Sequence, residues 1–123
     1  MTRINIRSGS LSFQATLADN ASGQGLASIL PLSGRANTWG DEIYFSIPLE
    51  AELEVGATDQ LPAGSLAFWP PGNAFCIIWG PTPASQGDEP RFASPVNLLG
   101  SIESDLGPLS RIRDGDEVVI EAV

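Results

Sequence analysis

The fold is decided by two apolar runs on either side of a turn, in the stretch Leu66-Ala67-Phe68-Trp69-Pro70-Pro71-Gly72-Asn73-Ala74-Phe75-Cys76-Ile77-Ile78-Trp79. The pattern predicts a strand, a tight connection at residues 70–73 and a second strand. Apolar residues occupy both alternating positions of the second run, which predicts a strand covered on both faces. Cys76 lies inside that run, and we expect an inert core thiol because the chain has no Lys or His to activate it.

The segments before this pair of strands predict a hairpin and one short helix. Apolar and polar residues alternate over 3–7 and 11–17, as they do in strands with one inward face. Asn20 or Ser22 is a suitable cap for a helix over about residues 22–30.

From residue 33 onward, short apolar segments punctuated by Gly and Pro favour a barrel or a sandwich. Residues 80–95 contain four prolines and no apolar period, which predicts a long surface loop of a kind that is often functional. Residues 96–102 and 118–123 predict strands, and Asp105 is a suitable cap for a second short helix between them.

The composition of the chain excludes several classes of function. The 123 residues suit one domain, residues 1–123. A net charge of -9 excludes the basic patch that nucleic acid and anionic membranes require. All six basic residues are Arg, and without Lys or His there is no catalytic triad, Schiff base or P-loop. A single Cys without His excludes a conventional zinc site, so we expect no metal and no cofactor.

The location of the protein follows from its first residues and its cysteine content. The first twenty residues alternate polar and apolar side chains and contain no continuous apolar run, so no signal peptide is predicted. No apolar stretch approaches the roughly 18 residues that cross a bilayer. A lone Cys forms no disulfide within the chain, and we therefore expect a cytoplasmic protein.

Three carboxylates alternate with apolar residues at Glu50, Glu52 and Glu54. A strand here would place them on one face, where clustered oxygen ligands suit a divalent cation. The favoured interpretation is a solvated strand face that discourages edge-to-edge aggregation.

Several segments together resemble the small bacterial and archaeal cyclophilin-like proteins of unknown function. The resemblance rests on the runs Asn37-Thr38-Trp39-Gly40-Asp41-Glu42-Ile43-Tyr44-Phe45-Ser46-Ile47-Pro48, Phe68-Trp69-Pro70-Pro71-Gly72-Asn73-Ala74-Phe75-Cys76, Gly80-Pro81-Thr82-Pro83 and Ala93-Ser94-Pro95-Val96-Asn97-Leu98-Leu99-Gly100. The resemblance implies a closed, eight-stranded antiparallel barrel with one or two short helices over its open ends.

True cyclophilins are peptidyl-prolyl isomerases, and the resemblance bears on that activity. The run at residues 43–48 stands where cyclophilins carry F-H-R-x-I-P, so Phe45 or Ser46 replaces the Arg that contacts the substrate carbonyl. The proline-pocket Trp and Leu of the enzymes fall near Arg91 and Phe92. Arg91 is a candidate substitute donor. The favoured alternative is that it pairs with Asp88 or Glu89 on an exposed loop.

Aromatic residues supply the remaining candidates for a site. Core packing is the more common role for any single aromatic side chain, yet in a small barrel some of them must line the same region. The candidates are Trp39, Tyr44, Trp69, Phe75 and Phe92.

Trp69 precedes the turn at a strand end, where its indole can face a groove. Glu42 shares a strand face with Tyr44, and the pair can orient a polar ligand at the barrel mouth.

Three hypotheses remain. The leading one is a module that binds a small molecule or a proline-containing peptide in a groove lined by Trp39, Glu42, Tyr44, Trp69, Phe75 and Phe92. The second is a divergent prolyl isomerase that uses Arg91. The third is a small-molecule enzyme with Glu42 as its base. An exposed strand beside the barrel mouth is also compatible with a homodimer.

Overall fold

The computed structural model describes residues 2–123 and is dominated by one antiparallel β-sheet. The elements in chain order are β1 (Thr2–Ser8), β2 (Leu11–Leu17), α1 (Ala21–Ser28), β3 (Leu32–Arg35), β4 (Asn37–Thr38), β5 (Glu42–Ser46), β6 (Thr58–Gln60), β7 (Ser65–Trp69), the 3-10 helix η1 (Pro70–Gly72), β8 (Ala74–Ile78), β9 (Arg91–Ile102), the 3-10 helix η2 (Gly107–Arg111) and β10 (Glu117–Ala122). No helix within residues 2–123 is both long enough and apolar enough to span a membrane.

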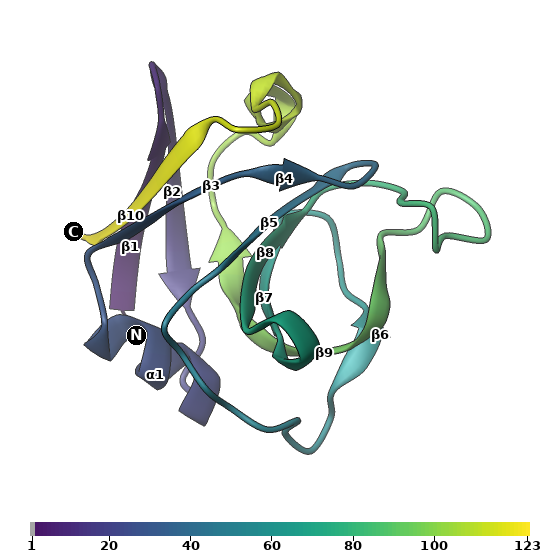
Figure 1. Ribbon diagram of the computed structural model, residues 1–123, viewed down its shortest axis with the longest axis horizontal. Coiled ribbons are helices and arrows are strands. Elements are labelled where there is room, and N and C mark those ends of the chain that lie inside the picture. Colours follow the sequence, from purple (N-terminus) through teal and green to yellow (C-terminus); the bar gives the residue numbers. More distant parts are fainter. Residues whose placement is uncertain (1) are drawn as a thin grey trace.

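The sheet curls so that β1, β2 and β10 form one side of the molecule while β7, β8 and β9 curve around the other (Figure 1). The strand order is β3-β10-β1-β2-β9-β7-β8-β5-β4, and β6 pairs with β9 outside this path. In Figure 1, α1 and η2 lie at opposite ends of the curled sheet.

The expected closed barrel of eight strands is wrong on both counts, because the sheet has ten strands and no ladder joins β3 to β4 within residues 2–123. These two end strands are consecutive in the chain, with only Ala36 between them. The Ala36 N–H donates to the Asp116 carbonyl, and its own carbonyl accepts from the Gly115 N–H. The backbone at the junction is therefore bonded to the turn before β10, and the two ends of the sheet meet through the chain itself.

The predicted hairpins are confirmed. Strands β1 and β2 pair from Thr2↔Leu17 to Ser8↔Leu11. Strands β7 and β8 flank η1, where Asn73 adopts a left-handed conformation (φ 46°) and donates its N–H to the Pro70 carbonyl.

Every residue of β8 is buried, as the apolar pattern predicts. Its alternate side chains enter two separate core clusters. Phe75 and Ile77 belong to the main cluster, together with residues of the β1–β2 hairpin and β10. Cys76 and Ile78 belong to a smaller one, defined here as the second cluster, whose buried members are Ala67, Ala74, Cys76, Ile78, Phe92 and Val96. The candidate site lies beside this second cluster.

The first helix differs from expectation in its bounds, and the second is a 3-10 helix. Helix α1 begins at Ala21 and ends at Ser28, with the Asn20 side chain accepting the Gly23 N–H at 2.8 Å. The second helix is the short 3-10 helix η2, preceded by a contact in which Asp105 accepts the Gly107 N–H at 3.1 Å.

Two segments were assigned wrongly from the sequence. The loop expected over residues 80–95 ends at residue 90, because Arg91 already pairs with Gln60 as the first residue of β9.

Residues 50–55 form no strand. The buried Asn97 side chain accepts the Glu54 N–H at 2.8 Å and donates to the Glu52 carbonyl at 2.8 Å. These backbone groups are thus bonded to a side chain instead of to a neighbouring strand. No group of three or more metal-ligating side chains gathers anywhere in residues 2–123.

Candidate functional site

A cavity of about 170 Å³ opens beside the second cluster. The lining residues are Trp39, Glu42, Tyr44, Trp69, Cys76, Phe92 and Ala93. They come from β5, β7, β8, β9 and the turn between β4 and β5. Strand geometry gathers them: Glu42 and Tyr44 alternate on one face of β5, and Cys76 is the register partner of Tyr44 on β8.

The structure brings five of the six proposed ligand-binding residues into this lining: Trp39, Glu42, Tyr44, Trp69 and Phe92. Phe75 lies elsewhere, fully buried in the main cluster with its ring centroid 5.4 Å from that of Phe45. Its neighbour Cys76 takes the place at the cavity, because successive side chains of a strand point to opposite faces.

Two lining residues, Cys76 and Ala93, were missed as site residues. Strand alternation was the available signal for Cys76: it lies one position from Phe75 and therefore on the opposite face. Nothing in the sequence singles out Ala93.

Glu42 is the chemically distinctive residue of the cavity. Glu42 is only 5% exposed, and its Oε1 accepts no hydrogen bond from the described residues. Burial raises the pKa of Glu42 from 4.5 to about 7, an effect that a hydrogen bond with the Cys76 side chain partly offsets. A carboxyl group in this condition can exchange a proton near neutral pH and still has an oxygen free to accept a donor.

Cys76 contributes a neutral thiol to the lining of the cavity. Burial raises its pKa well above 9.0, and the neighbouring Glu42 carboxylate raises it further. Because the thiolate is the nucleophilic form, this environment suppresses nucleophilic chemistry at the sulfur. Cys76 is buried, as expected.

The indole of Trp69 is held in place at the end of β7. Its Nε1–H donates to the Ser94 Oγ at 2.7 Å. On another side, a Cβ atom at Gly72 would lie 3.0 Å from the ring, so the absence of a side chain there lets η1 pack against the indole. The ring is thus held before any ligand arrives.

The backbone of the turn that carries Trp39 is fixed in the same way. The Trp39 N–H donates to the Glu42 carbonyl at 2.9 Å, and the Asp41 N–H donates to the Pro81 carbonyl at 2.9 Å. Gly40 adopts φ +61° and lies so close to loop 79–90 that a Cβ atom would stand 2.7 Å from the Cα of Thr82. Only glycine suits this combination of backbone angle and contact.

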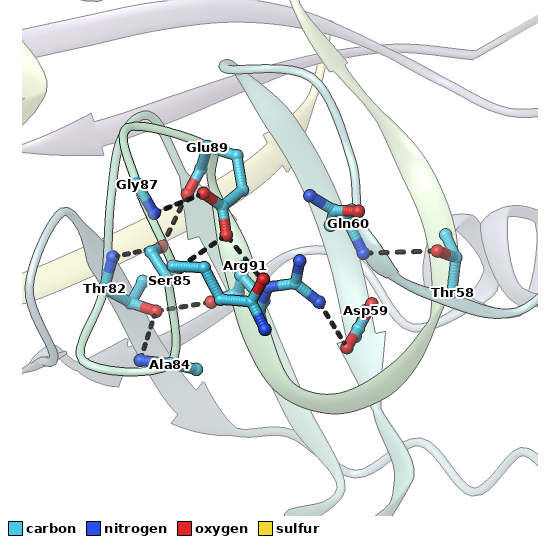
Figure 2. A network of polar contacts seen from close by, with 10 residues as sticks. Thr58, Asp59, Gln60, Thr82, Ala84, Ser85, Gly87, Glu89 and Arg91 are labelled. Atoms are coloured by element: carbon cyan, nitrogen blue, oxygen red, sulfur yellow. Dashed lines mark hydrogen bonds and ion pairs between the residues drawn. The ribbon is translucent and has the colours of Figure 1, made fainter.

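Arg91 does not line the cavity. Figure 2 shows its guanidinium between two carboxylates, with Nε 2.9 Å from Glu89 and Nη1 3.0 Å from Asp59 on β6. Glu89 also accepts the backbone N–H groups of Gln86 and Gly87, and these hydrogen bonds, with that from Arg91, lower its pKa to about 2. The expected pairing with Glu89 is confirmed, and Asp59, not Asp88, is the second partner.

A family model described as Cyclophilin-like matches residues 2–121. The solution structure of the hypothetical protein AF2241 from Archaeoglobus fulgidus is similar over 99% of this chain and 95% of that chain, with 35% sequence identity and a TM-score of 0.82. No curated protein matches the sequence.

Proposed function

The chain belongs to the Cyclophilin-like family, and we propose that this member binds a small organic molecule, or a group of similar size on a peptide, in the cavity around Glu42. The observation that carries the proposal is the unpartnered Oε1 of Glu42 within a wall of aromatic rings. A buried polar atom without a partner destabilises a fold by roughly 1–3 kcal/mol, so such atoms are uncommon outside functional places. Glu42 lines the cavity, and a ligand with a hydrogen-bond donor satisfies its carboxyl group once Oε1, which is shielded from water, turns toward the ligand.

The size of the cavity sets the size of the ligand. A cavity of about 150 Å³ is known to accommodate benzene. The volume here, about 170 Å³, therefore suits one ring with a small substituent. The rings of Trp39 and Trp69 supply flat apolar walls, and the carboxyl group supplies a polar anchor, which is the usual composition of a small-molecule site.

Tryptophan indole signals in ¹H-¹⁵N NMR spectra test this function with an internal control. Trp39 and Trp69 line the cavity, whereas Trp79 packs against the main cluster. Addition of ring-sized fragments such as benzyl alcohol, benzylamine or N-acetylproline amide is expected to shift the first two signals and leave the third unchanged. If no fragment shifts them at millimolar concentration, or if all three move together, the cavity is not a binding site.

A second candidate function, carboxylate-dependent catalysis on a small molecule, is favoured by the pKa of Glu42, which burial brings to about 7. General acid–base catalysis works best when the pKa lies near the working pH. Turnover of a bound substrate would follow a titration near pH 7 and would disappear in Glu42→Gln. A rate that is flat between pH 5 and pH 9 excludes this role.

The divergent prolyl isomerase proposed from the sequence has lost its assigned donor. It required Arg91 beside the prolyl amide, but the guanidinium is bonded to Asp59 and Glu89 and lies outside the lining.

A further inference from the structure

The electrostatic character of the cavity indicates which ligands it favours. Four aromatic rings, one carboxyl group and one thiol line it, and no Arg of residues 2–123 is among the lining residues. Arg91 precedes Phe92 on β9, yet its guanidinium already has two carboxylate partners. Thus no cation within the described lining compensates the charge of Glu42 when it ionises.

The aromatic rings add to this negative character. The face of an aromatic ring carries excess negative charge and attracts cations, most strongly for Trp. Trp39, Tyr44, Trp69 and Phe92 all contribute to the wall around the carboxyl group. An anionic ligand would be repelled by Glu42, whereas a cation would be attracted by the carboxylate and by any ring face that borders the cavity.

Hydrogen bonding gives the same preference independently. The Trp69 Nε1–H is directed to the Ser94 Oγ and does not satisfy Glu42. Oε1 of Glu42 is buried and accepts nothing from the described residues. An ammonium group has N–H donors but no acceptor, so it complements the Glu42 carboxyl group in hydrogen bonding as well as in charge.

We propose that the cavity recognises an organic amine in its protonated form, with the ammonium group on Glu42 and a ring-sized apolar group between the aromatic side chains. This inference rests on the binding function proposed above and specifies its ligand class. The net charge of -9 supports it, because a negative protein attracts cations over long distances and repels anions.

The pH dependence of binding follows from the groups around Glu42. Cys76 faces it from β8 and stays neutral, and Tyr44 lies on the same face of β5. Asp41 precedes Glu42, but its carboxylate packs against Gly80. Arg91 of β9 is held in ion pairs. An ammonium group binds the ionised carboxylate, so the affinity for amines is expected to decrease as the pH falls below 7. Below about pH 6 the decrease should reach about tenfold per pH unit.

Three probes of equal ring size and different charge test the inference: benzylamine, benzyl alcohol and benzoate. The shifts of the Trp39 and Trp69 indole signals give the dissociation constants at pH 8. Benzylamine is expected to bind at least about tenfold more tightly than benzyl alcohol, and benzoate is expected not to bind, because only the cation gains from both the carboxylate and the rings.

Glu42→Gln keeps the shape of the side chain and removes its charge. In this variant the affinity for benzylamine should fall to that for benzyl alcohol, whose own binding should change little. Glu50→Gln is the matched control, because Glu50 is exposed and outside the lining; all affinities should remain those of the unaltered protein. The pH dependence of benzylamine binding to the unaltered protein is a second measurement that requires no variant.

The outcomes separate the two proposals. If benzyl alcohol or benzoate binds as tightly as benzylamine, the preference for a cation is overturned while the binding function stands. If benzylamine binding is independent of pH between 5 and 8, the role of Glu42 as its anchor is overturned. If none of the probes shifts either indole signal, the binding function and the inference both fail.

Discussion

Glu42 on β5 and Cys76 on the adjacent strand β8 line the same cavity, and their side chains interact. Each changes the protonation of the other. The carboxylate raises the pKa of the thiol, and the thiol hydrogen bond partly offsets the rise that burial causes in the pKa of Glu42. The pair therefore presents a neutral sulfur beside a carboxyl group that titrates near pH 7.

The raised pKa of Glu42 predicts a loss of stability as the pH increases. The unfolded chain releases this proton at about 4.5 and the folded protein at about 7, so between these values the folded state binds more protons. The free energy of unfolding should fall over this interval by at most about 3 kcal/mol. Glu42→Gln has no such proton to lose.

Chemical unfolding of both proteins at pH 4.5 and pH 8 checks this prediction. The variant should gain stability relative to the unaltered protein by about 3 kcal/mol between the two pH values. Other carboxylates, including Glu89, are shared by both proteins and cancel in the difference. An unchanged difference between Glu42→Gln and the unaltered protein at the two pH values would show that Glu42 titrates normally.

Cys76 should resist alkylation in the folded protein. Burial and the Glu42 carboxylate both disfavour the thiolate, which is the reactive form. Reaction with iodoacetamide at pH 8 should be on the order of 100-fold slower than for free cysteine, and it should become fast when guanidinium unfolds the chain. Mass spectrometry measures both rates. Equal rates in the folded and unfolded protein would mean that the thiol is accessible.

Asn97 should anchor the irregular segment 48–57. Its side chain accepts the Glu54 N–H, donates to the Glu52 carbonyl and donates to the Ser22 Oγ at 3.1 Å. Asn97→Ala removes these bonds, so the protein should lose about 2–3 kcal/mol of stability. Hydrogen exchange at the Glu54 amide should accelerate more than exchange in β1.

Asn37→Ala is the control for that variant, since the Asn37 side chain is exposed and donates only to the Tyr44 carbonyl. Its effect should remain below about 1 kcal/mol. If Asn97→Ala is equally mild and the Glu54 amide keeps its protection, the segment is held by other contacts.

Ser94 should keep the Trp69 indole in its orientation. Ser94→Ala removes the acceptor of the Nε1–H, at a cost of about 1 kcal/mol in stability. The Trp69 indole signal should shift and exchange faster with solvent, and affinities for cavity ligands should fall because the ring is no longer fixed in advance. Ser33→Ala, at an exposed position of β3, should leave the signal unchanged. An unaltered Trp69 signal in Ser94→Ala would contradict this role.

Much of the local structure could be predicted from the sequence because it depends on short-range patterns. Alternation and turn residues are enough to predict the β1–β2 hairpin and the β7–η1–β8 unit. The same alternation places Glu42 and Tyr44 on one face of β5. The alternation along β8 also shows that Phe75 and Cys76 cannot both face the cavity. Deciding which of the two does so requires knowing which face of β8 each core cluster covers.

The remaining features depend on contacts between distant residues. The Ala36 junction is bonded to the turn at residues 115–116, so the sheet ends there without a ladder between β3 and β4. The segment at residues 50–55 has the alternation of a strand, but its backbone is hydrogen-bonded to the Asn97 side chain. Asn97 lies 43 residues after Glu54 in the chain. Likewise, Asp59 reaches Arg91 from another strand. Such partners have no signal in the local pattern.

A pH titration of the Glu42 carboxyl carbon by ¹³C NMR, with and without saturating benzylamine, bears most directly on the site. Glu42→Gln identifies the signal. In the free protein the pKa is expected to be about 7, and bound ammonium should lower it by at least about one unit, because a neighbouring cation favours the ionised form. A pKa near 4.5 in the free protein that benzylamine leaves unchanged would contradict both the buried carboxyl group and its role as the anchor for a ligand.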